Sequence, residues 1–268
     1  MKRFILSEKP DADGKVRLFG KEYHYLARVR RLAPGAVFDA FLPDGAGVRI
    51  RVLSVDTRCL TGACLSGVEN PGGSVSCLPP LYLFQALPKG VKMDQIVRQA
   101  AEGGITGIIP FMSAYSLHIA SSQAEGRLER WRRIIREARQ QSGSGIPTEV
   151  EAPRSGEELL TYWEELRRRY PHAAGILFHQ APLEQGTLHG YLYNAPELVV
   201  ALIGPEGGFS PAETSRFIEA GFKPLVMGDT VLRVETAALY AAAAIRIILL
   251  ERLSWMPKIP LPWKESAS

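Results

Sequence analysis

The sequence predicts an α/β protein in which a small β-barrel precedes a parallel sheet covered by helices on both faces. Three observations carry this prediction. After residue 75, apolar strand-like segments alternate with amphipathic helical segments, a pattern typical of parallel sheets. Residues 36–66 instead contain short segments in which apolar and charged residues alternate, as in half-buried strands. A turn-rich segment, residues 70–80, separates the two parts and predicts a domain boundary near residue 75.

Two strands and a helix can be recognised in the first predicted domain, residues 1–74. The strand segments 36–42 and 47–55 flank a Pro-Asp-Gly turn at 43–45, a connection typical of a β-hairpin. Residues 21–32 carry apolar side chains at helical spacing. Arginines of this helix and of the second strand are predicted to face solvent or nucleic-acid phosphate: Arg28, Arg30, Arg31, Arg49 and Arg51.

Strands and helices alternate in the second predicted domain, residues 75–253. Strands are expected at 81–86, 105–111, 175–179, 197–204 and 224–227. Helices are expected at 89–102, 128–141, 157–170, 211–220 and 236–253. Two of these helices begin at capping boxes, in which a serine precedes a glutamate by three residues: Ser155 with Glu158, and Ser210 with Glu213. Residues 254–268 form a Pro-rich tail to which we assign no chemistry.

The predicted helix 128–141 is rich in arginine. Its apolar positions predict a buried stripe, listed here as Leu128, Trp131, Ile135 and Ala138. The basic residues should then lie largely on other faces: Arg132, Arg133, Arg136 and Arg139. Such a run is consistent with an RNA-facing ridge and equally with a solvated helix face.

Composition excludes several classes of protein. An apolar content of 46% with 22% charged residues is that of a globular protein and excludes disordered and fibrous chains. The N-terminal apolar run is too short for a signal peptide. The longest apolar stretch, residues 237–250, is interrupted by Arg246 and is shorter than the ~18 residues of a membrane span. We therefore expect a cytoplasmic protein without membrane contact.

The distribution of charge suggests a nucleic-acid partner, and the cysteine content argues against a metal site. The net charge of +4 arises within residues 1–72, which hold 12 Lys/Arg and 8 Asp/Glu; this fits a nucleic-acid-anchoring domain and also an ordinary basic one. The three cysteines, Cys59, Cys64 and Cys77, form no CxxC pair. We expect buried thiols, with no disulfide framework and no metal site.

Two loops carry the strongest functional signal. The first, residues 202–213, reads LIGPEGGFSPAE and places three glycines between an apolar strand and a capped helix, so that a ligand can approach the backbone closely. The second, residues 227–238, reads MGDTVLRVETAA and also follows an apolar strand. Ligand sites of open α/β sheets lie at such strand ends. The first loop lacks both GK[ST] and GxGxxG, which argues against a nucleoside triphosphate or dinucleotide site.

Individual side chains near these loops have alternative roles. Arg233 can donate to an anionic oxygen or phosphate or form a structural ion pair. Glu235 and Thr236 suit a helix start. His179 ends the strand 175–179 and could reach the same pocket. Ser210 is explained by its capping role, because the GxSxG pattern of a serine hydrolase is absent.

The chain closely resembles the ribosomal small subunit methyltransferase E family of the knotted SPOUT methyltransferases. The two loops carry most of the resemblance, together with the Lys-Gly-Val-Lys-Met-Asp segment at 89–94, Gly103-Gly104 and Ile109-Pro110. Residues 24–35 resemble the family's N-terminal HxxxVxR segment. The resemblance implies a PUA-like RNA-binding barrel, a trefoil-knotted α/β domain, a homodimer and no metal. It also implies S-adenosylmethionine as cofactor and methylation of uridine N3 in 16S ribosomal RNA or the small ribosomal subunit.

The two loops and the expected methyl transfer together supply candidate site residues. The cofactor is expected to contact residues of both loops and the neighbouring strand end: His179, Leu202, Ile203, Gly204, Pro205, Gly207, Gly208, Met227, Gly228, Leu232 and Thr236. Arg233 is expected to stabilise the uracil anion by donating hydrogen bonds. Glu206 is a weaker candidate for a general base, because a carboxylate needs a raised pKa for that role.

Two segments depart from the family pattern. Residues 113–116 read Ser-Ala-Tyr-Ser where the family has a Glu-Arg pair, and residues 144–147 read Ser-Gly-Ile-Pro where it has an Arg-rich link. The alternatives are therefore a methyltransferase acting on a different RNA site and a non-catalytic RNA-binding paralogue. A third, from another class, is an enzyme whose glycine loop holds a phosphate-bearing metabolite.

Overall fold

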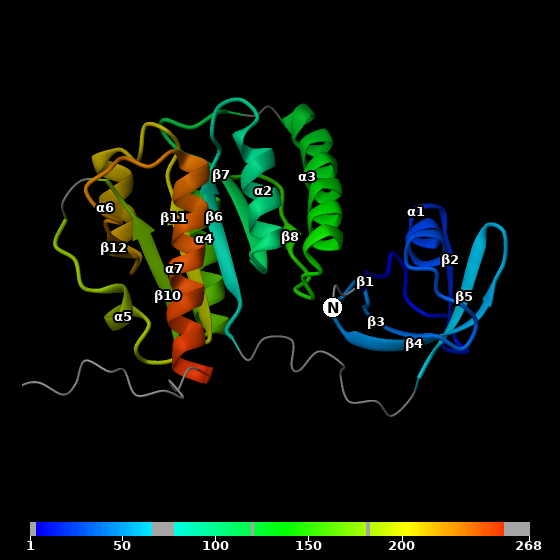
Figure 1. The fold of residues 1–268 in the computed structure, drawn as a ribbon. Helices are drawn as coiled ribbons and strands as arrows, with labels where there is room; N and C mark the ends of the chain where they lie inside the picture. Colours follow the sequence, from blue (N-terminus) through cyan, green and yellow to red (C-terminus); the bar gives the residue numbers. More distant parts are fainter. Residues whose placement is uncertain (1–3, 66–77, 119–120, 181–182, 255–268) are drawn as a thin grey trace, which may run out of the picture.

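The computed structural model describes residues 4–65, 78–118, 121–180 and 183–254 (Figure 1). The predicted domain boundary near residue 75, Cys77 and the tail beyond Ser254 lie outside these ranges. Cys59 and Cys64 are free, half-buried thiols.

The N-terminal part forms a five-stranded sheet in the order β1-β3-β4-β5-β2. Its strands are β1 (Phe4–Ile5), β2 (Lys15–Phe19), β3 (Val37–Phe41), β4 (Gly47–Val55) and β5 (Cys59–Cys64). The predicted strands 36–42 and 47–55 are thus confirmed as β3 and β4. The predicted helix 21–32 is α1 (Gly20–Tyr23) continued by a π-helical turn (His24–Val29). The short strands β1 and β2 were not predicted: β1 has only two residues, whereas the alternation in β2 is a signal that was overlooked.

A second sheet contains seven strands and is parallel throughout its described pairs. The main path runs β12-β10-β11-β6-β7-β8, and β9 pairs with β7. The strands are β6 (Leu81–Ala86), β7 (Gly107–Met112), β8 (Glu149–Val150), β9 (Arg154–Ser155), β10 (Ala173–Phe178), β11 (Leu198–Ile203) and β12 (Lys223–Leu225). The predicted parallel sheet is confirmed.

Helices cover both faces of this sheet, as predicted (Figure 1). Buried residues of α2 (Lys92–Glu102), α3 (Ser121–Ser142) and α7 (Val234–Ser254) share one core cluster. Buried residues of α4 (Gly156–Arg169) and α6 (Pro211–Glu219) share the other. A short helix, α5 (Leu188–Tyr191), precedes β11. Successive side chains of β11 alternate between the clusters, as strand geometry requires.

The predicted helix starts at Ser155 and Ser210 are both complete capping boxes. Each serine side chain accepts a hydrogen bond from the backbone N–H of its glutamate, and that glutamate accepts one from the serine N–H. Gly221 ends α6 with a φ of 92°, a left-handed conformation in which glycine is favoured.

Helix α3 buries Trp131, Ile135 and Ala138 as predicted, but the expected exposure of Arg139 is wrong. Arg139 is only 8% exposed, and its Nη1 donates to the Pro43 carbonyl oxygen at 3.2 Å. The helix packs against the main sheet and also approaches the N-terminal sheet, a second contact that its periodicity does not reveal.

Two glycines allow close contact between the N-terminal sheet and the segment that follows α3. A Cβ on Gly145 would lie 2.6 Å from the Phe41 ring, and a Cβ on Gly45 would lie 2.3 Å from the Gly145 carbonyl oxygen. The Ile5 N–H also donates to Gln140 Oε1 at 3.3 Å. The departing segment 144–147 therefore packs, at Gly145, against the N-terminal sheet.

Gly145→Ala is expected to destabilise the protein by about 1–3 kcal/mol, because the added methyl overlaps the Phe41 ring and overpacking costs this much. Thermal unfolding measures the effect. Gly126→Ala on α3 is the matched control, since a Cβ there meets no atom within 4 Å and alanine favours a helix. Equal melting temperatures for the Gly145 variant and wild type would contradict the contact.

Candidate functional site

A cavity of about 560 Å³ lies at the carboxyl ends of three adjacent strands. Its walls come from residues 178–180 after β10, 203–209 after β11 and 226–234 after β12. Parallel strands end at one edge of the sheet, so these distant segments meet there, as the sequence predicted. Lys92 at the start of α2 and Ala237 of α7 complete the lining.

Glycine geometry shapes the first loop. Gly208 has a φ of 68°, and a Cβ there would meet no atom within 4 Å. A Cβ on Gly204 would lie 3.3 Å from Gly208 Cα and from the Phe209 ring. A Cβ on Gly207 would lie 3.1 Å from Tyr115 Cβ, which places the departing segment 113–116 directly against this loop. The loop is therefore closely folded on itself and on its neighbour.

The second loop passes from β12 into α7. Gly228 has a φ of 119° with open space around a would-be Cβ, so it turns the chain where other residues would be strained. Arg233 precedes α7 and accepts a hydrogen bond at its carbonyl from the Ala237 N–H, at 2.8 Å. Within the described ranges its guanidinium forms no ion pair or hydrogen bond, so a structural ion pair does not account for it.

Most of the predicted site residues line this cavity. They are His179, Ile203, Gly204, Pro205, Glu206, Gly207, Gly208, Met227, Gly228, Leu232 and Arg233. His179 also lies 3.4 Å from Thr214 Oγ1, measured from Nε2. The fold thus brings eleven predicted site residues from three separate segments to one cavity.

Two predicted cofactor residues lie outside the lining. Leu202 is fully buried in the cluster shared with α4 and α6, because it alternates with Ile203 along β11 and points to the opposite face. Thr236 is exposed on α7, whereas Val234 and Ala237, three residues apart on the helix, line the cavity. Neither residue lines the cavity, and their contact with the cofactor stays a prediction.

Sequence reasoning also missed several lining residues, among them Lys92, Gln180 and Asp229. Lys92 belongs to the 89–94 segment that carried part of the resemblance. Its helix follows β6, and β6 pairs directly with β11. That adjacency, which is a tertiary property, brings Lys92 to the glycine loop.

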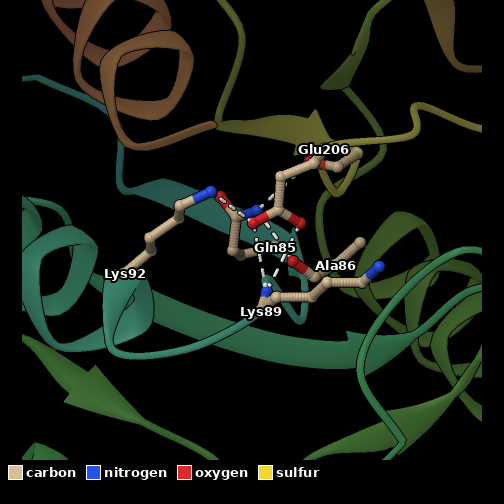
Figure 2. A network of polar contacts seen from close by, with 6 residues as sticks. Gln85, Ala86, Lys89, Lys92 and Glu206 are labelled. Carbon is tan, nitrogen blue, oxygen red and sulfur yellow. Dashed lines mark hydrogen bonds and ion pairs between the residues drawn. The ribbon is translucent and has the colours of Figure 1, made fainter. Parts of the chain in front are cut away.

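Glu206 joins the glycine loop to the start of α2 (Figure 2). The Lys92 ammonium lies 2.6 Å from Glu206 Oε1, and the Lys89 N–H donates to the same oxygen at 3.1 Å. Beneath the loop, the buried Gln85 side chain donates to the Ala86 carbonyl at 2.9 Å and to the Gly204 carbonyl at 3.5 Å. The carboxylate is therefore held as a structural ion-pair partner.

The proposed base role of Glu206 is not supported. Partial burial by itself raises the pKa of Glu206, but the hydrogen bonds from Lys92 and from backbone N–H groups outweigh it and leave the pKa below its ordinary value of 4.5. A general base working near neutral pH needs the opposite shift.

Glu206→Gln is expected to lower stability by roughly 1 kcal/mol or less at neutral pH, because the ion pair is partly exposed. A depressed folded-state pKa gives stability that is present above the unfolded value of 4.5 and is lost as pH falls through the folded value. Denaturant unfolding of both proteins from pH 7 downward measures the difference, which should shrink below pH 4.5. A difference that grows on acidification would contradict the lowered pKa.

The predicted RNA-facing arginines of the N-terminal part differ in surroundings. Arg28, Arg31 and Arg51 are exposed, and the Arg28 guanidinium lies 5.9 Å from the Tyr23 ring centroid. Arg30 is half-buried. Arg49 forms an ion pair with Asp39 at 2.8 Å, which makes its charge less available to a partner.

Among the described residues, no group of three or more His, Cys, Asp or Glu side chains is arranged to hold a metal ion. No helix in the described ranges is long and apolar enough to cross a bilayer.

Comparison with known proteins identifies the family. The sequence model of the RNA methyltransferase domain matches residues 76–246. Ribosomal RNA small subunit methyltransferase E of Synechocystis is 32% identical over 92% of this chain and 78% of its own length. That of Aquifex aeolicus is 33% identical over 81% of this chain and 87% of its own.

A solved structure supports the same family assignment. Ribosomal RNA small subunit methyltransferase E from Neisseria gonorrhoeae, bound to S-adenosyl methionine, matches with a TM-score of 0.73 and 25% identity. The match covers 92% of this chain and 98% of that one. With its glycine loops and strand-end cavity, the chain belongs to the ribosomal RNA small subunit methyltransferase E family of RNA methyltransferases.

Proposed function

We propose that the protein transfers the methyl group of S-adenosylmethionine to uridine N3 in small-subunit ribosomal RNA. The observation that carries the proposal is the 560 Å³ cavity where both glycine loops meet at the strand ends. The relatives' names supply the RNA class, and uridine N3 comes from the family resemblance. Cytoplasmic location is part of the same proposal.

The cavity fits S-adenosylmethionine in size and chemistry. Cavities of roughly 300–1,000 Å³ hold small molecules of this class. Apolar side chains of Ile203, Met227 and Leu232 line the cavity and can pack on a flat adenine. Left-handed Gly208 and Gly228 leave open space beside the backbone, so its N–H and C=O groups can be approached. When bound, S-adenosylmethionine supplies an electrophilic methyl group.

Arg233 is our candidate catalytic residue. Uridine N3 carries a weakly acidic proton and becomes nucleophilic when that proton passes to solvent water. Methyl transfer to N3 then leaves S-adenosylhomocysteine as the second product. Arg233 lines the cavity, and its guanidinium can donate to the uracil oxygens, which stabilises the anion as it forms. Its five N–H donors suit two neighbouring oxygens.

Lys92 and Glu206 have a different proposed role. Lys92 lines the cavity while its ammonium is held by Glu206. Because Glu206 belongs to the glycine loop, the ion pair fixes the loop against α2 and places a second positive charge beside the site. We assign Glu206 to positioning and no longer to proton transfer.

The proposal also covers the two domains and the oligomeric state. The N-terminal sheet, within residues 1–74, is a PUA-like RNA-binding barrel, and residues 75–253 form a SPOUT domain with a trefoil knot. A homodimer is favoured by the exposed apolar residues of α7, which a second copy could bury: Leu239, Tyr240, Ile247 and Leu250.

Nucleoside analysis tests the reaction and its position. Small-subunit ribosomal RNA is incubated with the full chain and S-adenosylmethionine, digested and examined by mass spectrometry. We expect N3-methyluridine to appear. Methylation of another atom or base would support an altered RNA target, and RNA binding without methylation would support a non-catalytic paralogue. Binding of a phosphorylated metabolite in place of S-adenosylmethionine would support the third alternative.

A further inference from the structure

A second large cavity, of about 510 Å³, lies between the N-terminal sheet and α3. It is separate from the strand-end cavity: the two share no lining residue. In Figure 1 the N-terminal sheet lies to the right of α3, whereas α6 and β12 lie at the opposite side of the molecule. A ligand in this interdomain cleft would therefore sit away from the methylated nucleotide of the same subunit.

The cleft has an aromatic wall. Tyr25 lines it, and its ring is parallel to that of Phe4, with 5.9 Å between centroids and 8° between planes. Ile5 and Leu6 contribute further apolar surface. Aromatic rings of this kind serve as platforms on which nucleobases stack, independently of base identity.

The opposite wall is basic. Arg136 is exposed on α3, and Lys21 of α1, in the same N-terminal part as Tyr25, adds a positive charge to the cleft. Arg139 is more than nine-tenths buried, and its Nε and Nη2 have no hydrogen-bond partner among the described residues. Buried N–H groups are nearly always paired. Both nitrogens are out of contact with solvent, so Arg139 adds a buried positive charge behind this wall, and the exposed Arg136 is the residue that can meet an anion in the cleft directly.

Acidic groups in the cleft do not cancel this charge. Glu22 accepts a hydrogen bond from the Ser7 N–H at 3.0 Å, and burial raises the pKa of its carboxyl group. Glu137 is exposed on α3. Three basic side chains thus face two acidic ones.

On the basis of the proposed RNA substrate, we propose that this cleft binds a second nucleotide of that RNA, one that is remote from the methylated uridine. The base stacks at Tyr25, and the phosphate lies beside Arg136, with the buried charge of Arg139 behind it. The cleft contributes affinity for RNA and leaves the chemical step unchanged. It also explains the buried arginine of α3, which the strand-end site does not use.

Charge reversal on α3 tests the proposal with a control on the same helix. Arg136→Glu changes a lining residue, and Arg132→Glu changes an exposed residue outside the lining. Affinity is measured by fluorescence anisotropy with a labelled fragment of small-subunit ribosomal RNA. We expect Arg136→Glu to weaken binding about tenfold more than Arg132→Glu, since it adds a repelling charge at a phosphate. Tyr25→Leu should weaken binding by roughly fivefold or more through lost stacking.

Two further readouts separate binding from chemistry. At saturating RNA the methyl-transfer rate should stay within about twofold of wild type, and S-adenosylmethionine affinity should be unchanged. Melting temperatures check that each variant is folded, and Arg136 is exposed, so its replacement should not disturb the core.

Three results would overturn the proposal that the cleft binds RNA. They are equal weakening of RNA binding by both charge reversals, unchanged RNA affinity in Arg136→Glu and Tyr25→Leu, and no RNA binding by wild type. If wild type binds RNA without methylating it and the Arg136 and Arg132 variants still differ, the proposed function fails while the cleft stands.

Discussion

Arg233→Ala is expected to slow methyl transfer by about 10²–10³-fold with little change in S-adenosylmethionine affinity. Removing one preorganised donor aimed at a developing negative charge costs about this much. The cofactor's sulfonium is positive and gains nothing from a guanidinium. Arg233→Lys keeps the charge but loses the planar fork, so we expect a loss of roughly ten- to hundredfold. Single-turnover transfer to small-subunit ribosomal RNA, with saturating cofactor, measures both.

Arg216→Ala is the matched control. Arg216 lies on α6, forms a solvent-exposed ion pair with Glu157 at 3.8 Å and does not line the strand-end cavity. Its rate should equal that of wild type. Wild-type rates in both Arg233 variants would remove Arg233 from the mechanism.

Gly208→Val should weaken S-adenosylmethionine binding at least about hundredfold, which corresponds to roughly 2.7 kcal/mol. Gly208 has a φ of 68° and lines the cavity. A β-branched residue is strongly disfavoured in this left-handed region. The loop must either change its conformation or hold a strained side chain beside the ligand. Titration calorimetry measures the affinity.

Gly14→Val is the control for the effect of backbone strain alone. Gly14 has a φ of 72°, also with open space around a would-be Cβ, and belongs to the turn before β2 in the N-terminal sheet. This variant should lose comparable stability while keeping cofactor affinity. If both variants bound S-adenosylmethionine like wild type, the glycine loop would not be the cofactor site.

Local patterns were enough to predict much of the fold and the place of the site. The strand bounds of β4 and β6 and both capping boxes follow from residues close together in sequence. The two loops were recognised because each follows an apolar strand, and strand ends of a parallel sheet meet at one edge.

The errors concern contacts between elements distant in sequence. Leu202 is the exception, because alternation along β11 is a local pattern that already turns it away from the cavity. The pairing of β6 with β11, in contrast, is a distant contact and brings Lys92 to the cavity. Lys92 in turn explains why Glu206 has a lowered pKa. Arg139 is buried because α3 meets the N-terminal sheet. None of these contacts leaves a periodic signal in the segment concerned.

Transfer of labelled methyl groups tests the central claim most directly. Wild type and Gly208→Val are incubated with methyl-labelled S-adenosylmethionine and either small-subunit or large-subunit ribosomal RNA. The account predicts incorporation approaching one methyl group per small-subunit RNA with wild type, little into large-subunit RNA, and little with Gly208→Val at low cofactor concentration. No incorporation into small-subunit RNA or assembled small subunits by wild type that binds S-adenosylmethionine would contradict it.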